Sequence, residues 1–154
     1  MARFSLLRRR SNGPAQETAG VQPLDPDEAR RHLQQAWSIM DRAIELHPVA
    51  EAVIRACRED DAKTGVLGAE GGRVRDTYRR LREELRPLNL PSWLADDLAS
   101  TLDHHLELVS LALDLSYRPQ TERIEMQRHR LHGLGPSAGY LLALRHRLIE
   151  ELGA

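Results

Sequence analysis

The chain has 154 residues, which is the size of one ordinary domain. Its hydrophobic content of 41% and formal charge of −1 exclude a wholly disordered chain and argue against a strongly basic nucleic-acid-binding domain. The single cysteine excludes an intramolecular disulfide and a cysteine-rich zinc site. There are 25 leucines and 21 arginines but only 16 valines, isoleucines and threonines together, which favours helix over strand. We therefore expect an all-α fold, a single bundle of four to six helices.

Residues 1–24 are predicted to form a flexible basic and apolar arm, followed by a helical domain over residues 25–154. The arginines of MARFSLLRRR precede polar, turn-forming residues, which excludes a secretory signal, and no stretch has the 18 apolar residues of a membrane span. We expect a cytoplasmic protein whose arm is either a solvated terminus or a docking segment for an acidic protein, an anionic membrane surface or a nucleic acid. The arm residues predicted to contact a partner are Phe4, Leu6, Leu7, Arg8, Arg9 and Arg10.

Five or six helices are predicted after the arm. Asp25 followed by Pro26 is a helix start signal, and Pro48 is expected to separate the first two helices. The four glycines between Lys63 and Gly72 predict a mobile connection before the third helix. The predicted helices are Pro26–Leu46, Val49–Asp61, Arg73–Arg86, Pro91–Tyr117, Gln120–His132 and Ser137–Leu152.

Apolar residues recur three or four positions apart in each predicted helix, so each has an inner face. The helix over Pro91–Tyr117 carries a second apolar row of Leu108, Leu111 and Leu115, and its C-terminal half is expected to lie centrally in the fold. Cys57 is expected to be a small core residue. The weaker apolar face of the following helix comprises Ile124, Met126 and Leu131.

The near-zero total charge results from cancellation between segments. Residues 87–117 carry −5, whereas residues 73–86 carry +3 and residues 118–132 carry +2, which predicts basic helices beside an acidic central helix. We expect one acidic face to be a solvent strip or a row of ion pairs with arginines, and a partner-binding strip is the alternative. The residues of this face are Asp103, Glu107, Ser110 and Asp114, and the candidate arginines are Arg79, Arg82 and Arg86.

Catalytic and metal-binding motifs are scarce in this sequence. A di-metal bundle needs Glu-x-x-His elements, and the sequence has none. It also lacks the His-Glu-x-x-His motif. The segment from Gly133 to Ala138 matches a dinucleotide fingerprint by letter, but it follows a helix and contains Pro136.

These absences lead us to expect a non-enzymatic interaction or adaptor protein without a cofactor, which captures a protein partner or associates with itself through helix packing. Within the bundle, Arg75, Arg79 and Arg82 are predicted to contact the partner. A nucleic-acid-associated helical protein remains an alternative, with the arm and four arginines of the third helix as its contacts, Arg73, Arg75, Arg79 and Arg80. A bundle that binds a metal or a small ligand is another, with the candidate residues Asp103, His104, Glu107, His129 and His132.

Overall fold

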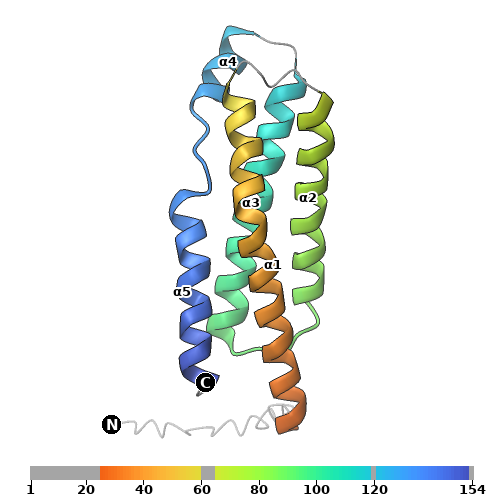
Figure 1. Ribbon diagram of the computed structural model, residues 1–154, viewed down its shortest axis with the longest axis vertical. Helices are drawn as coiled ribbons and strands as arrows, with labels where there is room; N and C mark the ends of the chain where they lie inside the picture. Colours follow the sequence, from red (N-terminus) through yellow and green to blue (C-terminus); the bar gives the residue numbers. More distant parts are fainter. Residues whose placement is uncertain (1–24, 60–64, 119–120, 153–154) are drawn as a thin grey trace, which may run out of the picture.

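The computed structural model describes residues 25–59, 65–118 and 121–152, and these residues form five α-helices and no strand. The helices are α1 (Pro26–Arg58), α2 (Gly65–Leu85), α3 (Ser92–Tyr117), α4 (Glu122–His129) and α5 (Gly135–Leu152). Four of them run along the molecule, and the short α4 lies across one end (Figure 1). The expected all-α bundle is confirmed. The predicted arm lies outside the described residues.

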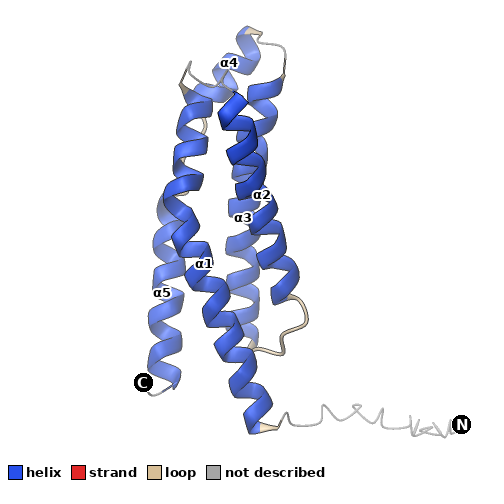
Figure 2. Cartoon of the chain, turned by 45° about the vertical axis from the view of Figure 1, so that its right-hand side comes forward, coloured by secondary structure: helices blue, strands red, loops and turns tan. Residues whose placement is uncertain are grey.

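The four long helices alternate in direction along the chain. α1 and α3 run the same way and pack directly on each other, whereas α2 and α5 run the opposite way (Figures 1 and 2). α2 packs against α1 and α3 on one side, and α5 packs against the same two helices on the other side. α5 has 18 residues against the 33 of α1, so it covers only part of the bundle. The segment between α4 and α5 buries Leu131 and Leu134 beyond the end of α5.

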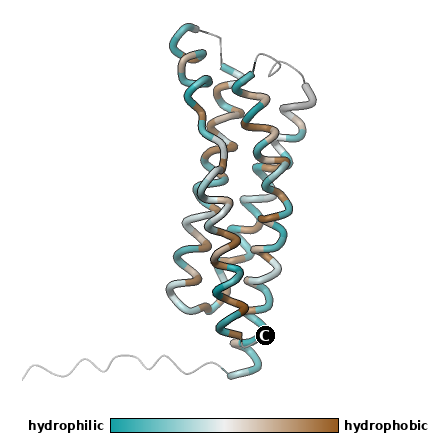
Figure 3. Tube along the Cα trace, turned by 60° about the vertical axis from the view of Figure 1, so that its left-hand side comes forward, coloured by the Kyte–Doolittle hydropathy of each residue, from teal (hydrophilic) through white to brown (hydrophobic). Residues whose placement is uncertain are grey.

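The core consists of aliphatic side chains at the inner positions of every long helix. Hydrophobic and hydrophilic residues alternate along each helix, so that each has an apolar and a polar side (Figure 3). Fully buried representatives are Ile39 and Met40 on α1, Leu98 and Leu102 on α3, and Leu141 on α5. Among the described residues, no helix combines the length and the apolar character needed to cross a membrane.

The break predicted at Pro48 is wrong, because α1 continues through this residue to Arg58. A proline within a helix removes one backbone hydrogen bond and costs about 3 kcal/mol. The ring of Pro48 faces solvent, while Ala43 and His47 before it and Ala50 and Ile54 after it are all buried. Burial on both sides of the proline therefore keeps one continuous helix.

The mobile connection predicted between Lys63 and Gly72 is also wrong, because α2 begins at Gly65. Glycine at position 71 allows α2 to approach its neighbours closely. A Cβ atom at this position would lie 2.4 Å from Cδ2 of Leu113 on α3 and 3.2 Å from Cγ1 of Val53 on α1. The glycine that lowers helix propensity thus permits the packing that stabilises the helix.

Two expected inner faces are wrong in part. Leu111, placed in the second apolar row of α3, has 47% of its surface exposed, and Met126 on α4 has 48% exposed. Leu111 lines a hollow between α3 and α4, at the end of the bundle that α5 does not cover. α4 is also shorter than predicted and buries Arg128 instead of Met126.

Candidate functional site

An apolar groove runs between α1 and α5 near the end of the bundle that holds the C-terminal end of α5. It has a volume of about 300 Å³ and is lined by Gln34 and Trp37 from α1 and by Ile149 and Leu152 from α5. Three of the four lining side chains are hydrophobic. We call this hollow the α1–α5 groove.

One edge of the α1–α5 groove is held by Arg145 on α5. Its guanidinium carbon lies 5.0 Å from the centroid of the Trp37 ring, and its Nε lies 3.0 Å from Oδ1 of Asp41 on α1. A cation over an indole ring and an ion pair on the next turn both restrict the rotamers of the participating side chains. The indole that forms one wall of the groove is therefore held in place before any partner binds.

The α5 helix also carries an unusual share of exposed apolar surface. Of the six large hydrophobic side chains that are well exposed in the described part of the chain, three are on α5: Tyr140, Leu142 and Leu152. Single exposed leucines are ordinary on a protein surface, but an exposed apolar helix beside an apolar groove is typical of a binding surface.

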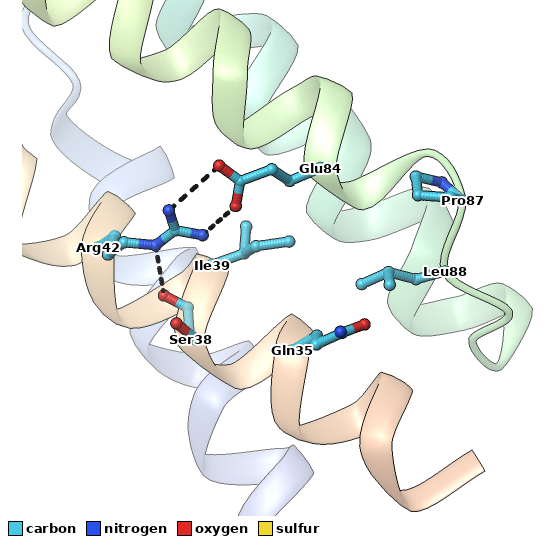
Figure 4. A pocket seen from close by; sticks show the side chains of 7 residues that line it. All are labelled: Gln35, Ser38, Ile39, Arg42, Glu84, Pro87 and Leu88. Carbon is cyan, nitrogen blue, oxygen red and sulfur yellow. Dashed lines mark hydrogen bonds and ion pairs between the residues drawn. The ribbon is translucent and has the colours of Figure 1, made fainter. Parts of the chain in front are cut away.

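A second hollow, of about 320 Å³, lies between α1 and the connection from α2 to α3 (Figure 4). Arg42 donates both terminal amino groups to the carboxylate of Glu84 and its Nε to the carbonyl of Ser38. The hydrogen bonds from Arg42 lower the pKa of Glu84. Both side chains are nearly half exposed, so the pair stabilises the fold by no more than about 1 kcal/mol. The two charged groups pair with each other, and the rest of the lining mixes polar and apolar side chains: Gln35, Ser38, Ile39, Pro87 and Leu88.

A third hollow, of about 400 Å³, separates the C-terminal part of α3 from α4. Leu111, Leu115 and Leu131 line it together with polar and charged side chains of both signs. The charged and polar members are Asp114, Arg118, Gln127 and Arg130. This mixture makes the third hollow less distinctly apolar than the α1–α5 groove.

The core contains a layer of polar side chains, one from each long helix. His47 of α1, Tyr78 of α2 and His105 of α3 are all at least nine-tenths buried, and Ser137 of α5 is partly buried beside them. The His105 ring meets the His47 ring edge-to-face at 5.0 Å and the Tyr78 ring at 5.3 Å, between centroids. Nε2 of His105 lies 2.9 Å from Oγ of Ser137. We call these four residues the polar layer.

The hydrogen bonds of the polar layer define which histidine nitrogen carries a proton. The Ser137 hydroxyl donates to the carbonyl of Leu134, so Nε2 of His105 is the donor to Ser137 Oγ. Nδ1 of His105 is then an unprotonated atom, buried and without a hydrogen-bond partner among the described residues. Burial, together with the nearby His47 and His104, lowers the pKa of His105 to about 4. Burial also lowers the pKa of His47, against the opposing charge of Glu51.

The contact between Ser137 and His105 resembles a nucleophile beside a base, but it lacks two features of a catalytic triad. The hydroxyl proton of Ser137 is directed to Leu134, and no carboxylate of the described chain contacts Nδ1 of His105 to orient the ring. The histidine is also a weak base because its pKa is low. The polar layer is therefore better suited to holding helices together than to activating a nucleophile.

The structure brings together only part of the acidic face predicted on α3. Oδ1 of Asp103 lies 2.9 Å from Nε of Arg82, which confirms one of the ion pairs expected between α2 and α3. Arg79 instead pairs within α2, 3.1 Å from Oδ1 of Asp76, and Nε of Arg75 lies 3.5 Å from the same atom. Arg75, Arg79 and Arg82 thus neutralise carboxylates of this chain, and their predicted role in binding a partner stays a prediction.

The residues considered for a metal site do not converge. In the described part of the chain, no group of three or more histidine, cysteine, aspartate or glutamate side chains is arranged to hold an ion. His129 bonds the carbonyl of Glu125 through Nδ1, and His132 is exposed. Cys57 is buried and donates its thiol hydrogen to the carbonyl of Ala112, 2.8 Å away, as expected for a core residue.

The arm residues predicted to bind a partner, from Phe4 to Arg10, lie outside the described residues.

The sequence analysis missed the polar layer, although a signal was present. His47, Tyr78 and His105 each occupy an inner-face position of a different helix, so three polar side chains point to one core.

No family model, curated protein or solved structure matches this chain.

Proposed function

We propose that this chain is a protein-interaction module that binds an apolar segment of a partner protein in the α1–α5 groove. The observation that carries the proposal is the lining of this groove, in which Trp37, Ile149 and Leu152 are accompanied by a single polar residue, Gln34. Tryptophan is among the residues that contribute most to binding at protein interfaces.

The groove also suggests what the partner presents. Its walls are two antiparallel helices, and a third helix packed along them would bury apolar residues at helical spacing. A volume of about 300 Å³ suits one or two large aliphatic or aromatic side chains. Full burial of one such side chain contributes about 2 kcal/mol. A partner helix with two or three apolar anchors would therefore bind with modest, reversible affinity after the entropic cost of association.

The test uses Trp37 as a reporter. The chain has two tryptophans, so the Trp93→Phe variant leaves Trp37 as the only indole. A display library of amphipathic helical peptides is selected on this variant, and binding is followed by the blue shift and reduced acrylamide quenching of Trp37. A dilution series of the protein alone, followed in the same way, tests whether a second copy occupies the groove.

Two leucines of α5 provide a matched pair of variants. Leu152 lines the groove and is 40% exposed, whereas Leu142 does not line it and is 43% exposed. We expect Leu152→Glu to weaken peptide binding or self-association at least about tenfold, the equivalent of about 1.4 kcal/mol, and Leu142→Glu to leave it unchanged. Equal effects of the two substitutions, or binding that leaves Trp37 fluorescence unaltered, would rule out the groove as the binding site.

A further inference from the structure

We propose that the polar layer of His47, Tyr78, His105 and Ser137 is a proton-operated latch that fastens the N-terminal turn of α5 to the bundle and releases it on acidification. Because α5 also supplies Ile149 and Leu152, its release removes one wall of the α1–α5 groove. Only this consequence rests on the proposed function. The latch itself depends on contacts within the described chain.

The first turn of α5 is attached to the bundle by polar contacts. Ser137 Oγ accepts a hydrogen bond from His105 of α3, 2.9 Å away, and the backbone N–H of Gly135 donates to Oε1 of Glu51 of α1, 3.2 Å away. The Glu51 carboxylate lies so close to Gly133 that a Cβ atom there would be 2.3 Å from it. The start of α5 is thus held from both α1 and α3.

Protonation of His105 disturbs this attachment directly. A second proton must bind at Nδ1, a buried atom that has no hydrogen-bond acceptor beside it among the described residues. The new cation would have the edge-to-face His47 ring 5.0 Å away and the His104 ring 6.4 Å away, between centroids. Burying a cation without a counter-charge is unfavourable, so the proton favours conformations in which His105 reaches water.

The groups that face the two histidines from each packed helix do not compensate for such a charge. α1 contributes Glu51, which interacts with His47 but already accepts the N–H of Gly135. α2 contributes Tyr78, whose buried hydroxyl has no hydrogen-bond partner among the described residues and whose pKa is raised by burial and by the charge of Glu51. α3 contributes His104, itself a base, and α5 contributes the neutral Ser137. A proton on His105 therefore has no carboxylate beside it among the described residues, whereas Glu51, the carboxylate near His47, is already bonded to Gly135.

α5 is the long helix that can leave with the least disruption. α2 and α5 both pack on α1 and α3, but α5 is the shortest of the four long helices, with 18 residues against 21 in α2, and its contacts with α1 and α3 are less extensive than those of α2. Departure of α5 exposes its inner row, Leu141, Leu144 and Leu148, and the faces of α1 and α3 against which that row packs, but it leaves the contacts among α1, α2 and α3 in place. Acidification is thus expected to open α5 before the remaining helices unfold.

Hydrogen–deuterium exchange of the whole chain tests the latch. The exchange is read by mass spectrometry at about pH 7.5 and about pH 5, with exchange times corrected for intrinsic rates. We expect peptides from α5 to lose protection by about tenfold for each pH unit below about 6.5, while peptides from α1, α2 and α3 keep theirs. The His105→Gln variant, which cannot take up the proton, should lose this selectivity. If His105→Gln fails to fold, Ser137→Ala, which removes the acceptor of His105 on α5, should lower the protection of α5 already at about pH 7.5. His146→Gln, at an exposed position of α5, is the matched control.

Uniform loss of protection in all four long helices would overturn the latch, as would α5-selective loss that persists in His105→Gln or α5 protection that is unchanged by Ser137→Ala. Unchanged protection of α5 at both pH values would overturn it equally. Exchange requires no partner, so failure of the latch and failure of partner binding in the α1–α5 groove are separate results. A peptide bound in the groove at about pH 7.5 should dissociate on acidification only if both proposals are correct.

Discussion

Gly71 and Gly72 are neighbours in α2, and substitution of each by alanine is expected to change stability in opposite directions. A Cβ atom at Gly72 meets nothing within 4 Å. Gly72→Ala therefore gains the helix propensity of alanine, which raises the free energy of unfolding by up to about 1 kcal/mol. At Gly71, the same atom would lie 2.4 Å from Cδ2 of Leu113 and 3.2 Å from Cγ1 of Val53.

The two side chains that face Gly71 have little room to move. Val53 is 1% exposed and Leu113 is 4% exposed, and they belong to the two helices between which α2 packs. Overpacking of a core by one methyl group costs about 1–3 kcal/mol, from which the propensity gain of alanine is subtracted. We expect Gly71→Ala to lower the free energy of unfolding by up to about 2 kcal/mol. Because both variants gain the propensity of alanine, they should differ by the overpacking cost, about 1–3 kcal/mol.

Urea titrations followed by circular dichroism measure this difference, provided that the dependence of the free energy on urea is the same for all variants. In thermal unfolding, each kcal/mol corresponds to about 2–4 °C in Tm for a chain of this length. Gly139→Ala on α5, where a Cβ atom also meets nothing within 4 Å, is a further control that should stabilise. Equal effects at Gly71 and Gly72 would refute the close packing of α2 and restore the mobile connection predicted from the sequence.

Three other measurements follow from the described side chains. The pKa of His105 is about 4 in the fold and about 6.5 when the chain is unfolded, so the unfolded chain binds the proton first as the pH falls. The free energy of unfolding should therefore fall by about 3 kcal/mol between pH 6.5 and pH 4. Urea titrations of His105→Gln should show a flatter pH dependence. Burial raises the pKa of the Cys57 thiol, which also donates to the carbonyl of Ala112. A disulfide reagent should therefore react with this thiol only after urea unfolds the chain. Immediate reaction of the native protein would contradict the burial of Cys57. Glu84→Gln removes the half-exposed ion pair with Arg42 and should lower the free energy of unfolding by less than about 1 kcal/mol, and by less still at high salt. A larger decrease that does not depend on salt would contradict the exposure of this pair.

The candidate sites were only partly predictable. The pairing of Arg82 with Asp103 follows from a basic helix adjacent to an acidic one, and the structure contains it. The α1–α5 groove was not predictable, because Trp37 and Leu152 are distant in sequence and meet only when α5 packs on α1. The polar layer was missed for a related reason. A histidine on an inner face is unremarkable in one helix, and it becomes a proton site only when other helices exclude water from it.

The sequence by itself determined the helical class and several boundaries. Leucine-rich spacing of three and four, the start at Asp25 and Pro26, and the prolines around α3 act over one or two turns, where local propensity and capping suffice. Tertiary structure alone decided that α1 passes through Pro48 and that α2 includes Gly71 and its neighbours. Local preference opposes both outcomes by no more than a few kcal/mol, and burial against other helices exceeds that cost. Burial of this kind depends on residues far away in the chain, so no local pattern contains it.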